Sequence, residues 1–194
     1  GAPMNPYNWH ADYGNSNWDV RHRFVASFNY DLPFFRSASN GFVRETLGGW
    51  QTNGIVTLQT GFPFNVTVSG DPANTGRSNE RPNLLGTPSD NCGNGHLTGC
   101  IDSAAFGSPV AYTYGDAGRN LLYGPGLDNV DFSLFKSFRI RERLNLQFRS
   151  EFFNFFNTPA FSNPNATYGT TSFGSITSTK HDNREIQFAL KLLF

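Results

Sequence analysis

The sequence predicts an all-β fold, an antiparallel meander of about five long strands joined by long loops. Apolar and polar side chains alternate with a period of two in five segments, whereas few windows show the spacing of an amphipathic helix. These segments run for about nine to thirteen residues, longer than the five or six that are common in soluble sheets. Gly, Pro and Asn concentrate in the connections between them, as turn chemistry requires.

The first two alternating segments are RHRFVASFNYDL, at 21–32, and WQTNGIVTLQT, at 50–60. In the first, one face carries Phe24, Ala26, Phe28, Tyr30 and Leu32. In the second, one face carries Trp50, Thr52, Gly54, Val56 and Leu58. Polar residues dominate the opposite faces, so each segment is expected to be a strand with one apolar side.

Three further segments follow, VDFSLFKSF at 130–138, LNLQFRSEF at 144–152 and REIQFALKLLF at 184–194. The first has an apolar face that Lys136 interrupts, formed by Phe132, Leu134 and Phe138. The apolar face of the second consists of Leu144, Leu146, Phe148 and Phe152. That of the third consists of Ile186, Phe188, Leu190, Leu192 and Phe194. Arg, Asn, Gln, Glu and Lys gather on the opposite faces.

Strand length and connection length together favour part of the wall of a transmembrane β-barrel. A tilted strand crosses a bilayer in about nine to eleven residues, with apolar side chains outward and polar ones inward. A soluble sandwich shows the same alternation. The connections at 33–48 and 139–143 are moderate or tight, whereas those at 62–129 and 157–183 are long. We therefore predict a single β unit over 1–194 with two outer loops at 62–129 and 157–183.

Four stretches resemble the last strands of TonB-dependent outer-membrane receptors, in particular the Oar-like receptors with a carboxypeptidase-regulatory-like domain. They are WDVRHRFVASFNYDLPF, LGGWQTNGIVTLQTGFPFNV, NVDFSLFKSFRIRERLNLQFRSEFFNFFNTPAFSNP and REIQFALKLLF. The terminal Phe194 also resembles that of substrates of the outer-membrane assembly machinery. The resemblance implies a barrel of about 22 strands, a plug domain and uptake of a bulky ligand, with location in the bacterial outer membrane.

Five strands leave a second hypothesis open. About eight is the smallest number that closes a single-chain membrane barrel, so both edges of the predicted sheet need partners. The partners expected are the lipid bilayer, the plug and remaining strands of a larger receptor, or other copies of the same chain. The alternative function is therefore a self-assembling extracellular β-sheet protein, a filament or a multichain barrel derived from such a receptor.

Charge excludes one class of function. Lys and Arg number 15, as do Asp and Glu, so no basic excess exists for binding nucleic acid. The charged fraction of 15% is below the roughly 25% of soluble domains, which indicates that lipid or another chain covers part of the surface. No apolar run predicts a transmembrane helix, and the start GAPMNPYNWH lacks the features of a signal peptide.

Cys92 and Cys100 predict a disulfide in the first outer loop, because the two cysteines are eight positions apart in an oxidising compartment. A zinc site that adds His96 is the weaker alternative. The segment DYGNSNWD offers Asp12, Asn15, Asn17 and Asp19 to calcium, although turn chemistry explains it equally well.

No catalytic, metal or cofactor motif is recognised, so the chain is expected to be non-enzymatic and to hold no cofactor. The sequons at Asn65 and Asn165 are possible glycosylation sites. Aromatic residues that fit an interfacial girdle, with ordinary packing as the alternative, are Tyr7, Trp9, Tyr13, Trp18 and Trp50.

Overall fold

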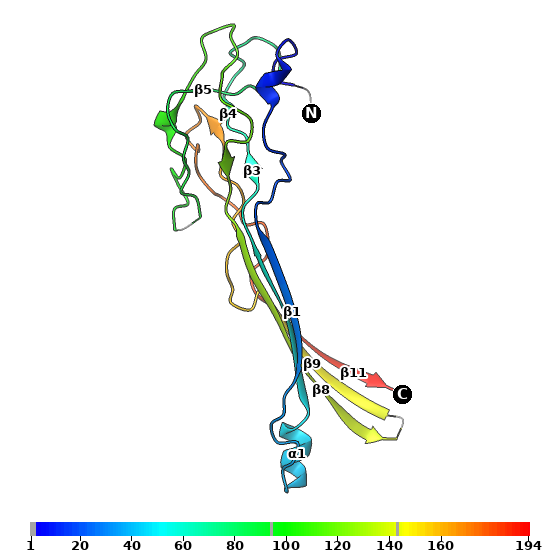
Figure 1. Cartoon of the computed structure of the whole chain (residues 1–194). Helices are drawn as coiled ribbons and strands as arrows, with labels where there is room; N and C mark the ends of the chain where they lie inside the picture. Colours follow the sequence, from blue (N-terminus) through cyan, green and yellow to red (C-terminus); the bar gives the residue numbers. More distant parts are fainter. Residues whose placement is uncertain (1–2, 94, 143) are drawn as a thin grey trace. The chain divides into compact units, whose positions relative to one another are not determined.

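The computed structural model describes residues 3–93, 95–142 and 144–194. The chain divides into two compact units, which are considered separately (Figure 1). The loop unit comprises Gly1–His22, Gln59–Leu127 and Ala160–Lys180. The sheet unit comprises Arg23–Leu58, Asp128–Pro159 and His181–Phe194.

The sheet unit is a five-stranded sheet in the order β1-β2-β8-β9-β11 (Figure 1). Its strands are β1 Arg23–Asp31, β2 Trp50–Gln59, β8 Leu127–Arg141, β9 Leu144–Phe153 and β11 Glu185–Leu193. Each long strand pairs with the next long strand along the chain, as an antiparallel meander requires. The predicted all-β class and the five predicted strands are confirmed.

The strand β8 is longer than the predicted segment at 130–138. Because β8 lies between β2 and β9, the polar residues at its ends have neighbouring strands to pair with. The alternation of side chains does not show these additional strand residues. Near the end of β8 the register with β9 shifts between Arg139 and Arg141. The predicted tight turn at 139–143 includes Arg143, which lies outside the described residues.

A short helix, α1 Gly41–Leu47, lies in the connection between β1 and β2, where no helix was predicted. The side chain of Asn40 caps it, because Asn40 Oδ1 accepts from Phe42 N at 2.9 Å and from Val43 N at 3.4 Å. With seven residues it is too short to show a helical repeat in sequence. In the described ranges, no helix is long and apolar enough to cross a membrane.

In the loop unit, the two predicted outer loops fold together with the N-terminal segment. Three pairs of two-residue strands join distant stretches: β3 Pro63–Phe64 with β7 Leu122–Tyr123, β4 Thr67–Val68 with β10 Thr167–Tyr168, and β5 Asn83–Leu84 with β6 Phe106–Gly107. Two 3-10 helices complete it, η1 Trp9–Asp12 and η2 Ser103–Ala105. A buried core is made by Phe64, Val66, Cys100, Ile101, Ala105, Phe106 and Leu122.

Close backbone packing at Gly61 gives a first prediction. A Cβ atom there would lie 1.6 Å from the carbonyl oxygen of Gly124, so the backbone must move to accommodate any side chain. We expect Gly61→Ala to lower the free energy of unfolding of the loop unit by about 3 kcal/mol or more, measured by hydrogen exchange. Gly86→Ala is the matched control, because its nearest neighbour, Ala105 Cα, is at 3.7 Å. Equal stability of both variants would contradict the packing at Gly61.

Candidate membrane-facing wall and loop unit

Strand register gathers the apolar side chains of three strands on one face of the sheet. Phe152 of β9 lies opposite Phe132 on one side and Ile186 on the other. Leu146 of β9 likewise lies opposite Phe138 of β8 and Leu192 of β11. Because side chains alternate between the two faces, the even-numbered residues of these strands share one face.

Contacts extend this face over β1 and β2. The ring of Trp50 in β2 meets that of Phe148 edge-on, with centroids 6.1 Å apart. A Cβ atom on Gly54 of β2 would lie 2.7 Å from the ring of Phe28 in β1. We call this face the apolar wall, and its large members are Phe24, Phe28, Tyr30, Trp50, Val56, Leu58, Phe132, Leu134, Phe138, Leu146, Phe148, Phe152, Ile186, Phe188, Leu190 and Leu192.

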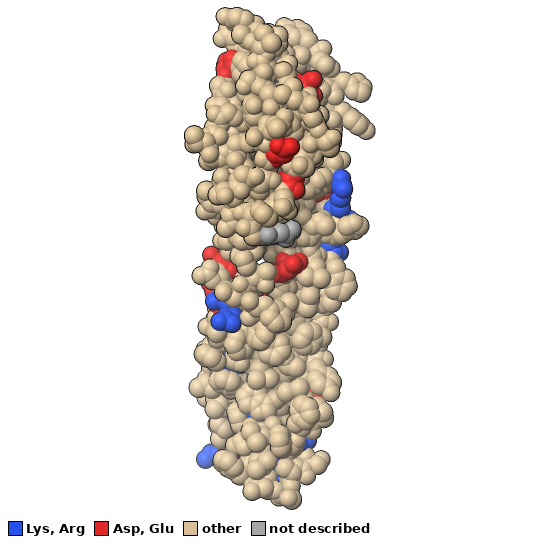
Figure 2. Space-filling view, turned by 90° about the vertical axis from the view of Figure 1, so that its left-hand side faces the viewer, with Lys and Arg blue, Asp and Glu red and all other residues tan. Residues whose placement is uncertain are grey.

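Much of the apolar wall is uncovered. Phe188 and Leu190 are 69% and 70% exposed, and Phe24 is 58% exposed. In the view of Figure 2, charged residues are few and scattered over a largely uncharged surface. An uncovered apolar surface that runs across five strands marks contact with a membrane or another chain.

The opposite face of the sheet is mostly polar, although it also carries Val25, Ile55, Phe135, Phe153 and Leu193. Arg149 and Glu151, two positions apart on β9, form an ion pair with Nη2 and Oε1 at 2.8 Å. Gln51 Nε2 donates to Asp31 Oδ1 at 2.6 Å, which links β2 to β1. The Arg149 guanidinium lies 6.0 Å from the ring centre of Phe135. A mostly polar face with an ion pair and a hydrogen bond between strands fits the lumen side of a barrel, although Arg149 Nε has no hydrogen-bond partner among the described residues.

Lys136 interrupts the apolar wall but is almost fully buried, at 4% exposed. Its Nζ donates to the carbonyl oxygen of Gly48, in the connection that precedes β2. The amine also lies 5.9 Å and 5.0 Å from the ring centres of Trp50 and Phe138. A long side chain that carries its charge to the end of a strand, along aromatic rings, is compatible with an apolar surface.

Of the ten residues predicted to face the membrane or to form the packing face, nine lie on the side of the sheet that carries the apolar wall. They are Phe24, Phe28, Tyr30, Trp50, Leu144, Leu146, Phe148, Phe188 and Leu190. Leu144 is the first residue of β9, opposite Arg141, and Phe194 follows β11 and is 98% exposed. Of the proposed aromatic girdle only Trp50 belongs to the sheet unit, and the other four residues belong to the loop unit.

The family model of the outer membrane beta barrel domain matches residues 1–187. The chain belongs to this family. Its five-stranded sheet is a segment of an outer-membrane β-barrel. The extracellular location that we considered as an alternative gains no support from this match. Comparisons with curated proteins and with solved structures gave no match.

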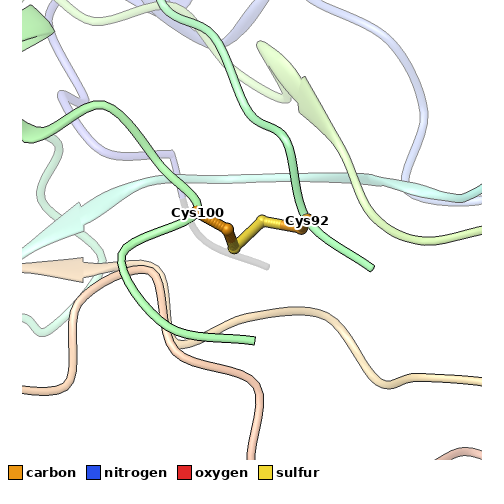
Figure 3. Close-up of a disulfide and its surroundings, with 2 residues drawn as sticks. All are labelled: Cys92 and Cys100. Atoms are coloured by element: carbon orange, nitrogen blue, oxygen red, sulfur yellow. A yellow bond between two sulfur atoms is a disulfide. The ribbon is translucent and has the colours of Figure 1, made fainter. Parts of the chain in front are cut away.

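In the loop unit of this barrel segment, Cys92 and Cys100 form the predicted disulfide (Figure 3). Their Cα atoms are 4.9 Å apart, and Cys100 packs in the core of the loop unit. Because both sulfur atoms are bonded to each other, the zinc alternative is wrong. Closing a loop of this length stabilises the folded state by about 2–3 kcal/mol in the chain-entropy model.

The oxygens considered for calcium instead anchor the N-terminal segment. Asp12 Oδ1 accepts from Arg81 Nη1 at 2.7 Å, and Asp19 Oδ2 accepts from the Tyr123 hydroxyl at 3.1 Å. Asn17 Oδ1 accepts from Asn120 Nδ2 at 2.7 Å. Asn15 donates through Nδ2 to the Tyr123 hydroxyl at 2.7 Å. The described residues contain no cluster of three or more His, Cys, Asp or Glu fit for a metal, and the calcium alternative is not supported.

The two sequons lie in half-buried positions of the loop unit. Asn65 Oδ1 accepts from Asn120 N at 2.8 Å. Asn165 Nδ2, the atom that would carry a glycan, donates to Ser172 Oγ at 2.6 Å. A glycan at Asn165 would replace this hydrogen bond, and glycosylation at either residue stays a prediction.

The pKa values of two carboxyl groups in the loop unit differ from their ordinary values. Burial raises the pKa of Asp90, and the backbone N–H groups of Thr75 and Gly76 lower the pKa of Asp71. Folding raises the pKa of Asp90, so the protonated carboxyl group adds to the free energy of unfolding. This contribution is largest below about pH 4 and is lost as the pH rises through the pKa of the folded state. Burial of a charged carboxylate therefore opposes folding at neutral pH.

We accordingly expect Asp90→Asn to unfold at a higher temperature than the wild type at pH 7. At pH 3 the two proteins should unfold at the same temperature, because Asp90 is then protonated in both the folded and the unfolded state. Asparagine keeps an acceptor oxygen for the backbone N–H of Tyr123 that faces Asp90. Thermal unfolding at the two pH values is the measurement. A wild type that is the more stable protein at pH 7 would contradict this expectation.

Proposed function

We propose that this chain is the C-terminal barrel segment of a TonB-dependent receptor, non-enzymatic, which takes up a bulky ligand across the outer membrane. The observation that carries the proposal is the apolar wall, which spans five paired strands and is backed by a mostly polar face. The resemblance of four stretches to the last strands of Oar-like receptors supports a TonB-dependent receptor as the kind of barrel. Membership in the outer membrane beta barrel domain family supports the location in the outer membrane.

The sheet supports a role within a larger barrel. β1 and β11 are its edge strands, and each has one side without a strand partner among the described residues. Closing a membrane barrel takes about eight strands or more. The receptor's other strands would pair with these edges, lipid would cover the apolar wall, and a plug would face the polar side.

Chain connectivity gives the orientation in this proposal. The long segments that follow β2 and β9 leave the sheet at the same end, because the strands alternate in direction. The connection that contains α1, and the one between β8 and β9, lie at the other end. Long loops outside and short connections on the periplasmic side are the usual arrangement in outer-membrane barrels. The long segments that follow β2 and β9 would then begin on the external side, where a ligand arrives.

The test compares three strains in one complex growth medium: the wild type, a deletion of the receptor gene and a deletion of tonB. Mass spectrometry of the spent media identifies what each strain leaves behind. We expect one component to be consumed by the wild type and retained by both deletion strains. Equal consumption by all three strains would overturn the proposal. Filaments or rings of the purified chain in negative stain would support pairing between copies instead.

A further inference from the structure

The loop unit contains a pocket of about 360 Å³, within the range that holds small molecules. Residues far apart in the sequence form it: Pro3, Trp9, Asp12, Asn17, Asn65, Asn79, Arg81 and Arg119. All of them belong to the loop unit, so the pocket lies within one compact body. The disulfide does not line it.

The charges that line the pocket do not cancel. Arg81 is 3% exposed and pairs with Asp12 at 2.7 Å, and its Nη2 donates to the carbonyl oxygen of Ala11 at 2.6 Å. Arg119 has no carboxylate partner among the described residues, and its Nη2 makes only a long contact of 3.4 Å with Asn17 Oδ1. Two guanidinium groups against one carboxylate leave one positive charge in excess.

Both arginines also have an unused donor. The Nε–H groups of Arg81 and Arg119 are buried and have no hydrogen-bond partner in the described part of the chain. Leaving a buried donor of a charged group unpaired costs free energy, and most such groups in native proteins have a partner. Both Nε atoms are closed to solvent, so an acceptor that enters the pocket meets the Nη atoms of the two guanidinium groups.

An aromatic surface lies beside these charges. Trp9 is 75% exposed, and its indole Nε1 donates to the carbonyl oxygen of Pro6 at 2.8 Å, which fixes the orientation of the ring. Trp9 thus offers a flat apolar surface to a ring-shaped ligand. Pro3, held by a hydrogen bond of 2.8 Å from Arg77 Nη1 to its carbonyl oxygen, adds a second apolar surface.

We propose that this pocket binds a small carboxylate whose ring lies against Trp9 and whose carboxylate oxygens accept from Arg81 and Arg119. A carboxylate carries one negative charge, which matches the single excess positive charge, and it is a planar acceptor suited to guanidinium donors. A phosphate monoester, with a charge near −2, would exceed that excess. That the pocket holds part of the transported ligand rests on the proposed function. That the pocket binds a carboxylate does not.

The test is calorimetric titration of the full-length receptor in detergent with 4-hydroxybenzoate, with 4-hydroxybenzamide as the neutral analogue. We expect one site for the acid and no detectable binding of the amide. Arg119→Gln should weaken binding of the acid by about 10- to 100-fold. Arg44→Gln is the matched control, since Arg44 is a solvent-accessible arginine of α1 that does not line the pocket, and it should bind as the wild type.

Arg119→Lys keeps the charge and loses the planar guanidinium with its paired donors, so it should bind the acid more weakly than the wild type and more tightly than Arg119→Gln. If circular dichroism shows that Arg119→Gln does not fold, the affinity of Arg119→Lys for the acid is the test. Equal binding of acid and amide, wild-type binding by the folded Arg119 variants, or binding of inorganic phosphate alone would overturn the inference. Uptake that is independent of TonB, with binding of the acid retained, would overturn only the proposed function.

Discussion

Replacing Phe188 by arginine is expected to destabilise the membrane-inserted barrel by about 2–4 kcal/mol, the cost of a guanidinium in the hydrocarbon layer near its midplane. Phe188 lies in the middle of β11, 69% exposed on the apolar wall. In the proposed orientation its side chain faces lipid. The free energy of unfolding of the receptor in phosphatidylcholine vesicles, from denaturant titration, measures the effect.

Gln187→Arg is the matched control for Phe188→Arg. Gln187 is the preceding residue of the same strand, and it lies opposite Glu151 on the polar face. An arginine there meets water or the carboxylate of Glu151, so a change of no more than about 0.5 kcal/mol is expected. Equal losses in the two variants would show that β11 does not separate a lipid face from a lumen face.

Replacing Asp12 by alanine is expected to cost the loop unit about 3–5 kcal/mol. The change leaves the guanidinium of Arg81, 3% exposed, without its carboxylate. It also removes the acceptor for the backbone N–H of Met4, 2.8 Å from Asp12 Oδ2. Hydrogen exchange across the loop unit is the measurement, and protection should fall most in the N-terminal segment.

Arg36→Ala is the control for Asp12→Ala, because it breaks an ion pair that is exposed to solvent. Arg36 Nη2 and Asp31 Oδ2 are 3.4 Å apart, and the two side chains are 47% and 54% exposed. Such pairs contribute at most about 1 kcal/mol. If Asp12→Ala cost no more than this control, the buried pair would not anchor the N-terminal segment.

The strands were predictable because their signal is local. Alternation in LNLQFRSEF and REIQFALKLLF already assigns Phe148 and Phe188 to one face, and the observed register aligns the two strands with those faces matched. The helix α1 was missed, although Asn40 stands before it as a capping residue. A single turn or two of helix carries too few positions for a period to show.

The loop unit was not predictable in the same way. Its core brings together Phe64, Ile101, Phe106 and Leu122, apolar residues that are scattered among Gly, Pro and Asn without any period. The disulfide could be predicted because both cysteines lie in one short stretch. The pocket could not, since Trp9, Arg81 and Arg119 come from three distant stretches that meet only in the folded chain.

Spin labels attached at consecutive positions of β11 test the central claim most directly, with the receptor in lipid vesicles. Single cysteines at Gln187, Phe188, Ala189 and Leu190 would carry the label, while the native cysteines stay in their disulfide. Collision rates with oxygen, which concentrates in lipid, and with a water-soluble nickel complex report the surroundings of each label. We predict high oxygen and low nickel accessibility at Phe188 and Leu190, and the reverse at Gln187 and Ala189. Accessibility without this alternation, or with the opposite phase, would contradict a lipid-facing apolar wall.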